Sequence, residues 1–156
     1  MIYRVCLFVL FMNYYGCSKD TINNQLISQD EYHSIIMFDN HSVLTLYKDK
    51  ALITSSSVSE NILTMKVQYG GGCQEHDFSL YGYSLFLKSN PPQAEVFLSH
   101  DGKNDMCEAF LQKEIHFDLL PLLDVCRHQF GRGQIILRIH EPDSTNPITP
   151  FVSVSF

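Results

Sequence analysis

Apolar residues occur in short runs along the chain from residue 32 onward, and turn-forming residues separate these runs. Within one run, Leu63, Met65, Val67 and Tyr69 alternate with polar residues, so the four side chains share one face of an extended strand. This period of two predicts strands with one face in a protein core and the other face in water.

The runs predict nine strands, and no long segment has a helical period. The predicted strands are Ile35–Phe38, Val43–Tyr47, Ala51–Thr54, Ile62–Tyr69, Phe78–Leu87, Ala94–Ser99, Cys107–Phe117, Ile135–His140 and Phe151–Phe156. Many short strands separated by turns are typical of an all-β domain.

One segment, Leu119–Phe130, has the features of a short helix instead. Asp118 can cap its start, Pro121 is tolerated in a first turn, and Gly131 suits the residue after the end. We therefore expect a mainly β fold, an antiparallel β-sandwich of immunoglobulin-like or jelly-roll type, with one short helix near residues 119–130.

Composition and charge narrow the range of partners. The chain has 156 residues, of which 45% are hydrophobic and 18% charged, and this is ordinary for a one-domain globular protein. The formal net charge is −6, and Lys and Arg form no cluster in the sequence. Because phosphate binding needs a basic surface, these values argue against nucleic acid as a partner.

The N-terminus has the pattern of an export signal. One positive charge, Arg4, precedes the apolar run Val5–Met12, which is too short to span a bilayer. Gly16 stands directly before Cys17, and this arrangement resembles the lipobox of bacterial lipoproteins, whose cysteine is lipid-modified and begins the mature chain. The two residues before Gly16 are tyrosines, where the lipobox has an aliphatic and a small residue. A plain secretory signal and a buried N-terminal strand are the alternatives.

These features predict a signal peptide over residues 1–16, a lipidated Cys17 with a flexible polar tether over residues 17–31, and the β-sandwich over residues 32–156. Acyl chains on Cys17 would hold the protein at a membrane surface. The expected location is a bacterial cell envelope, with the domain facing the periplasm or the exterior.

The predicted mature domain has an odd number of cysteines: Cys73, Cys107 and Cys126. In an oxidising compartment, Cys73 and Cys107 are the expected disulfide, since each lies at a strand end beside a flexible loop. The three glycines Gly70–Gly72 would supply a tight turn at one of these ends. Cys126 is then left as a buried free thiol within the helix.

A metal site is the alternative interpretation of the same region. Cys73, His76, His100 and Cys107 together offer two thiolates and two imidazoles, a donor set that zinc binds tetrahedrally. Because a thiol pair in a secreted protein is more often oxidised than bound to a metal, the expected state has a disulfide and no cofactor, with zinc as the alternative.

The combination Gly70-Gly71-Gly72-Cys73-x-x-His76-x-Phe78-x-Leu80, followed by Leu98-Ser99-His100-Asp101 and Cys107-Glu108-Ala109, resembles a group of uncharacterised envelope lipoproteins of bacteria. The resemblance covers roughly residues 69–117 and implies a lipoprotein with a β-domain. It implies no catalytic residues, and the atypical lipobox is where this chain departs from the pattern.

No arrangement in the sequence predicts catalysis. Ser99, His100 and Asp101 include the residue types of a serine triad, but adjacent residues on a strand point to opposite faces and cannot align as nucleophile, base and orienting acid. The expected function is therefore a non-enzymatic binding or structural module for an unknown protein or glycan. An envelope metal-binding protein or metal-dependent enzyme is one alternative. A protease-inhibitor-like module with exposed loops such as Asn90-Pro91-Pro92 is the other.

Overall fold

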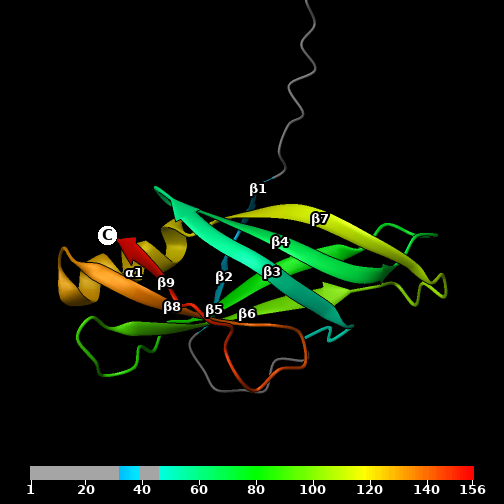
Figure 1. Cartoon of the computed structure of the whole chain (residues 1–156). Coiled ribbons are helices and arrows are strands. Elements are labelled where there is room, and N and C mark those ends of the chain that lie inside the picture. Colours follow the sequence, from blue (N-terminus) through cyan, green and yellow to red (C-terminus); the bar gives the residue numbers. More distant parts are fainter. Residues whose placement is uncertain (1–31, 39–45) are drawn as a thin grey trace, which may run out of the picture.

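The computed structural model describes residues 32–38 and 46–156, which form two facing β-sheets with one helix at an end (Figure 1). The elements are β1 (Tyr32–Ser34), β2 (Ile36–Phe38), β3 (Ala51–Ser59), β4 (Ile62–Gly71), β5 (Asp77–Tyr83), β6 (Gln93–Asp101), β7 (Ala109–Asp118), α1 (Leu120–Phe130), β8 (Gln134–His140) and β9 (Val152–Ser155). The predicted signal peptide, Cys17 and the tether lie outside the described residues.

One sheet has the strand order β1-β7-β4-β3 and the other has the order β2-β5-β6-β8-β9. This arrangement confirms the predicted β-sandwich with one helix. It differs from the expectation in one respect, because both sheets are mixed: β1 with β7, β2 with β5 and β6 with β8 run parallel. After β6 the chain leaves the second sheet, forms strand β7 of the first sheet and returns through α1. As a result, β8 runs in the same direction as β6.

The alternating residues of β4 form the centre of the core, as their period predicts. Leu63, Met65 and Val67 are fully buried between the sheets, and Leu98 of β6 and Phe117 of β7 lie in the same cluster. Burial of such side chains stabilises a fold by roughly 1.5–3 kcal/mol each. The hydrophobic period therefore decides which face of each sheet turns inward.

Strand positions match the sequence expectation in most places. Two strands differ clearly in length, since β3 runs to Ser59 and not to Thr54, and β5 ends at Tyr83 and not at Leu87. β1 was not expected, because three residues are too few to show a period. The predicted strand Val43–Tyr47 lies mostly outside the described residues. Of the part that the structure describes, Tyr47 accepts a hydrogen bond through its carbonyl oxygen from the backbone N–H of His100, at 3.2 Å between N and O.

The helix α1 lies close to its predicted position. The N-cap residue is Leu119, which makes no side-chain capping bond, and not Asp118 as expected. The Asp118 carboxylate, one residue earlier, accepts a hydrogen bond from the backbone N–H of Leu120 at 2.9 Å, and Gly131 ends the helix with a φ of 77°. Leu122, Leu123 and Cys126 are its buried residues. Among residues 32–38 and 46–156, no helix combines the length and the apolarity that crossing a bilayer requires.

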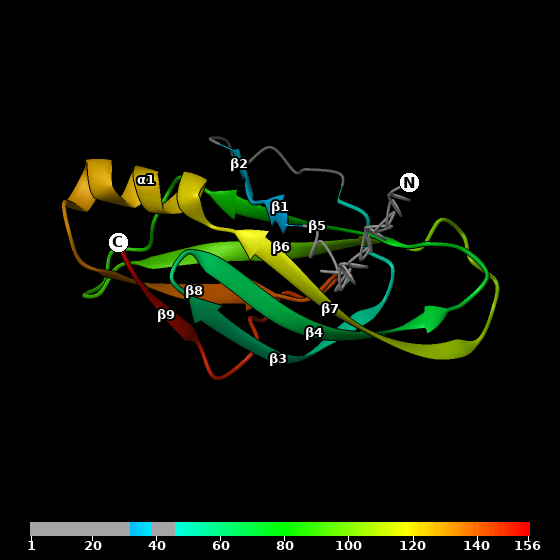
Figure 2. The ribbon, with the colours of Figure 1, turned by 90° about the horizontal axis from the view of Figure 1, so that it is seen from above.

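The sandwich has two distinct ends. Seen from above, α1 lies at one end, and the β4–β5 and β6–β7 connections project from the other (Figure 2). Strand pairing explains why these two connections meet, since Gly71 of β4 pairs with Ala109 of β7 and Asp77 of β5 pairs with Asp101 of β6. We call this region the loop end; it consists of residues 47–50, 70–77 and 100–110.

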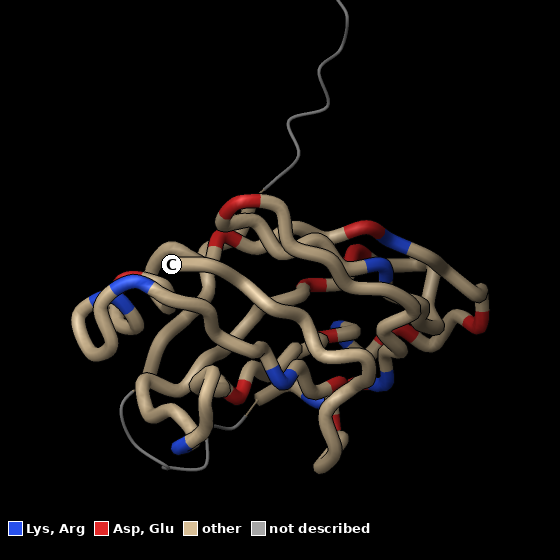
Figure 3. The backbone as a smooth tube through the Cα atoms, turned by 60° about the vertical axis from the view of Figure 1, so that its left-hand side comes forward, with Lys and Arg blue, Asp and Glu red and all other residues tan. Residues whose placement is uncertain are grey.

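Charged residues of both signs are interspersed along the described chain (Figure 3). Several form exposed ion pairs, such as Arg127 with Asp124 at 2.6 Å and Lys66 with Glu114 at 3.6 Å. Exposed pairs of this kind contribute little to stability. The fold therefore depends on its apolar core and on the buried polar contacts of the loop end.

Two phenylalanines of β7 test this account of the core. Phe117 is completely buried, whereas Phe110 is 75% exposed. We expect Phe117→Ala to lower the free energy of unfolding by roughly 3–5 kcal/mol, because it removes a buried ring and leaves a cavity. Phe110→Ala should change the free energy by less than about 0.5 kcal/mol. Denaturant titration followed by circular dichroism measures both values, and equal losses would contradict the burial described above.

Candidate functional site

The loop end is cross-linked by a disulfide. Cys73 follows β4 and Cys107 precedes β7, and their sulfur atoms are bonded with the two Cα atoms 5.8 Å apart. This is the pairing that the sequence analysis expected. The pairing follows from the strand register, because Gly71 and Ala109 are neighbours across β4 and β7.

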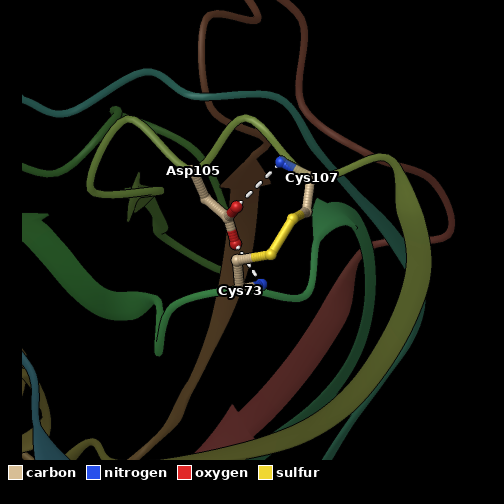
Figure 4. A group of neighbouring side chains, drawn as sticks. All are labelled: Cys73, Asp105 and Cys107. Atoms are coloured by element: carbon tan, nitrogen blue, oxygen red, sulfur yellow. Dashed lines mark hydrogen bonds between the residues drawn. A yellow bond between two sulfur atoms is a disulfide. The ribbon is translucent and has the colours of Figure 1, made fainter.

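Asp105 lies beside the disulfide and ties the same two loops together (Figure 4). Its Oδ2 atom accepts hydrogen bonds from three consecutive backbone N–H groups, those of Gly72, Cys73 and Gln74, at 2.8, 2.9 and 3.0 Å. Its Oδ1 atom accepts a bond from the N–H of Cys107 at 2.9 Å. Successive N–H groups that converge in this way form an anion-binding nest, and here the anion is the protein's own carboxylate.

Backbone donors stabilise the ionised form of this carboxyl group. They hold the pKa of Asp105 well below its usual range, with the N–H of Cys107 as the largest contributor, followed by those of Cys73 and Gln74 and by the His76 side chain. Burial opposes this effect, since the side chain is only 1% exposed. Hydrogen bonding therefore outweighs desolvation, and Asp105 is a buried anion.

Two histidines extend this network into the sandwich. Nε2 of His76 lies 3.2 Å from Oδ2 of Asp105, and Nδ1 of His76 lies 2.9 Å from Nε2 of His100. Nδ1 of His100 lies 3.1 Å from the carbonyl oxygen of Asp49. A hydrogen-bonded chain thus runs from a backbone carbonyl through two imidazoles to a buried carboxylate.

The partners of each nitrogen indicate where the hydrogens lie. The carbonyl of Asp49 only accepts, so Nδ1 of His100 donates to it. Burial lowers the pKa of His100, which keeps its ring neutral and leaves its Nε2 as an acceptor. Nδ1 of His76 faces this nitrogen and Nε2 of His76 faces the Asp105 carboxylate, so the imidazole of His76 bridges the two groups.

Aromatic rings surround the two histidines. The Phe78 and His100 rings are stacked, with centroids 4.4 Å apart, and Tyr69 of β4 contacts Phe78 and His100 edge-on at 5.2 Å each. Tyr69 therefore joins the two sheets at the loop end. Burial raises the pKa of the Tyr69 hydroxyl, and the negative charge of Glu75 raises it further. The tyrosine stays uncharged at neutral pH.

Two of the three glycines are required by this packing. Gly71 has a φ of 151°, and a Cβ atom there would lie 2.6 Å from the ring of His76. Gly72 has a φ of 121°, and a Cβ atom there would lie 3.0 Å from Ala109. Gly70 differs, because a Cβ atom there would meet nothing within 4 Å.

The open space at Gly70 belongs to a cavity of about 580 Å³, within the range of ligand-binding pockets. Its lining includes the network residues Tyr69, His76, His100 and Asp105, the apolar side chains of Leu52 and Phe110, and the polar side chains of Lys50, Gln68 and Asn104. Leu52 is 52% exposed and Phe110 is 75% exposed. The cavity therefore has the polar network on its wall and exposed apolar side chains among the residues of its rim.

The four residues proposed as a zinc site are arranged differently from a tetrahedral set. His76 and His100 contact each other, and the sulfurs of Cys73 and Cys107 are bonded to each other. Within the described residues, the donor atoms close enough to hold a metal are those of Cys73, Asp105 and Cys107. Asp105 was not among the expected site residues. Its position two residues before Cys107 was the available signal, since aspartate side chains commonly accept from the N–H two residues on.

Cys126 is a free, buried thiol in α1, as expected, and burial raises its pKa to about 12.

Ser99 and Asp101, which are residue types of a serine triad, make separate contacts within the fold. The Ser99 hydroxyl donates to the Tyr47 carbonyl, and the Asp101 carboxylate accepts from Lys103. The loop with Asn90-Pro91-Pro92 follows Phe86, which packs on Phe130 of α1, so that loop lies at the helix end and not at the loop end.

No protein-family model and no curated protein matches the chain. Solved structures share its fold at low identity. One is a "Putative lipoprotein" from Bacteroides fragilis, with 14% identity and a TM-score of 0.50 over 79% of this chain and 70% of that one. A second is a protein of unknown function from Bacteroides vulgatus, with 13% identity and a TM-score of 0.50 over 80% and 56% of the two chains.

A third is a NigD-like immunity protein from Bacteroides caccae, with 12% identity and a TM-score of 0.55 over 77% of this chain and 58% of that one. The chain thus spans less than two thirds of the length of the second and third proteins. At these identities the likeness shows a common β-sandwich fold, and function must be argued from the site.

The loop end should make stability depend on pH in two stages. Since His100 has a lowered pKa in the folded state, the unfolded chain takes up its proton first, and stability should fall as pH drops below about 6.5. Asp105 contributes stability above its unfolded pKa of about 4, and this contribution is lost as pH falls further. Asp101, whose pKa Lys103 lowers, adds to the second stage.

Asp105→Asn should therefore weaken the second stage, because the amide cannot offer an ionised oxygen to the nest. Denaturant titrations between pH 3 and pH 8 measure this, with Asp143→Asn as a control at a carboxylate whose side chain is 75% exposed. An unchanged pH profile in Asp105→Asn would contradict the role assigned to the carboxylate.

Proposed function

We propose that this chain is a lipid-anchored module of a bacterial envelope that binds a protein partner through the loop end of its β-sandwich and catalyses no reaction. The observation that carries the proposal is the cavity at the loop end, whose rim holds the exposed side chains of Leu52 and Phe110. Exposed apolar groups gathered at a hollow are characteristic of sites for protein partners.

The N-terminal sequence supports the proposed location in a bacterial envelope. The export signal and the Gly16-Cys17 junction precede the described domain. Among solved structures with this fold, one is called a putative lipoprotein and another a NigD-like immunity protein. These names support the proposal that the fold serves as a binding module in the envelope. They do not indicate a substrate.

The polar groups of the loop end support a binding role over a catalytic one. Catalysis requires a nucleophile or a base that is free to exchange a proton with a substrate. His76 and His100 each use both ring nitrogens in contacts within the protein, and both Asp105 oxygens accept backbone hydrogen bonds. These groups hold the loops in one conformation, which reduces the entropy lost when a partner binds.

A protein partner fits the rim better than a glycan does. Beside the polar lining residues Lys50, Gln68 and Asn104, the rim carries the exposed apolar side chains of Leu52 and Phe110. Met106, elsewhere in the loop end, is 91% exposed. Gly70 pairs with Phe110 across β4 and β7, and its missing side chain leaves a hollow beside that ring. An apolar side chain of a partner can enter this hollow as an anchor.

The lipid anchor is tested with Cys17→Ser in the full chain. We expect the wild type to incorporate labelled palmitate and to sediment with membranes, and Cys17→Ser to lose both properties, since the thiol is the acceptor for the lipid. Cys126→Ser is the control, because that thiol is buried in α1. Unchanged labelling and sedimentation of Cys17→Ser would exclude the anchor.

The binding site is tested with Gly70→Val. A valine Cβ meets no neighbouring atom, and Gly70 is not among the glycines with positive φ, so the variant should fold with a stability change within about 1 kcal/mol. It should fill the hollow and reduce partner capture by at least about tenfold, as loss of an anchor contact does. The measurement is quantitative cross-linking and mass spectrometry in native envelopes.

Lys66→Val is the matched control, since it lies on the same strand and face but outside the cavity. It should retain the partners that the wild type captures. Gly71→Val should instead destabilise the loop end, because its Cβ would collide with His76. Equal partner capture by Gly70→Val and the wild type would place the binding site elsewhere.

A further inference from the structure

The loop end also contains a donor set that differs from the one expected from the sequence. The side chains of Cys73, Asp105 and Cys107 lie together (Figure 4). Their ligating atoms are within 4.8 Å of one another, and Cys73 is exposed to solvent. We propose that, when the disulfide is reduced, these three residues bind a zinc-class divalent cation. Either the disulfide or the bound cation then links the two loops of the loop end.

The first argument is that the carboxylate keeps the two cysteines together without the disulfide. Asp105 accepts hydrogen bonds from the backbone N–H groups of both Cys73 and Cys107, and from those of Gly72 and Gln74. Reduction breaks only the S–S bond and leaves these contacts in place. The thiols therefore remain neighbours, and the entropy cost of assembling the site is already met in the folded protein.

The second argument is the geometry of the donors. In a tetrahedral zinc site, Zn–S bonds of about 2.3 Å and Zn–O bonds of about 2.0–2.2 Å place the ligand atoms roughly 3.5–3.8 Å apart. With Cα atoms 5.8 Å apart, side-chain rotation of the reduced cysteines reaches this spacing. Oδ1 of Asp105 accepts one backbone hydrogen bond and has a lone pair left for a cation. Water can supply the fourth ligand from the side of Cys73, which is exposed.

The third argument concerns the histidines. His76 uses Nδ1 toward His100 and Nε2 toward Asp105, and His100 uses Nδ1 toward the Asp49 carbonyl. Moving these rings onto the metal would break contacts that hold the loops and the aromatic cluster. Asp105 is therefore the third ligand in this proposal, and His76 is a positioning residue that supports it from the other side.

The chemical balance is simple. A dithiol reductant transfers two electrons and two protons to the Cys73–Cys107 disulfide and is itself oxidised to a disulfide. One divalent cation then displaces the two thiol protons, which are released to solvent. Two thiolates and one carboxylate carry three negative charges, which the cation reduces to one. The inference does not rest on the proposed protein partner.

The test uses the full chain, oxidised or reduced with a phosphine that does not bind zinc, under anaerobic conditions. Zinc binding is measured by competition with a chromophoric chelator, and Cd²⁺ serves as a second probe through its thiolate charge-transfer absorption. The reduced wild type should bind one more cation per chain than the oxidised protein. Cys107→Ser should lower the affinity of the reduced form by at least roughly 10- to 100-fold, with Cys126→Ser unchanged. Cys6 and Cys17 are common to all these proteins.

Asp105→Asn and His100→Gln separate the two ligand sets. Asp105→Asn should weaken binding, and circular dichroism of the oxidised variant shows whether the fold is retained. His100→Gln should weaken binding less than Asp105→Asn does, because it removes a contact of the supporting network and no ligand. The proposal is overturned if reduction adds no bound cation, if Cys107→Ser binds as the wild type does, or if His100→Gln loses affinity as strongly as Cys107→Ser.

Discussion

The loop end depends on one interaction, the burial of the Asp105 carboxylate against four backbone N–H groups. A buried anion is costly unless it is fully hydrogen-bonded, and here donors from both the β4–β5 and the β6–β7 connections satisfy it. The conformations of the two loops are therefore set jointly: neither can move without leaving a charge or a backbone donor unpaired in the interior. The disulfide links the same two segments covalently.

The glycines, histidines and aromatic rings of the loop end are arranged around this carboxylate. Gly71 and Gly72 lack side chains where the backbone must curl around Asp105 and approach His76. His76 meets the carboxylate on one side and His100 on the other, and the rings of Phe78 and Tyr69 fill the remaining space between the sheets. A polar network that is fully satisfied favours one conformation of its surroundings. The adjacent cavity thus has rigid walls, as a binding site requires.

The β-sandwich itself is shared with proteins of low sequence identity, so the fold does not specify the function. The features on which both proposals depend lie at one end of the sandwich. Leu52, Gly70 and Phe110 shape an apolar hollow, and the Cys73–Asp105–Cys107 group lies beside it. The proposed partner binding and the proposed metal binding both use loops that the strand register brings together.

Most of the strands, their buried faces and the position of the helix follow from the sequence by itself, and the sequence favours Cys73 with Cys107 as the disulfide. These features depend on periods of two residues, on helix-end signals such as Pro121 and Gly131, and on cysteines that lie at strand ends. The mixed sheets, the short β1 strand, the contact between His76 and His100 and the central place of Asp105 were decided by the tertiary structure. The physical reason is that each depends on which strands pair and in which register, and residues 70–77 and 100–110 become neighbours only after β4 pairs with β7 and β5 with β6.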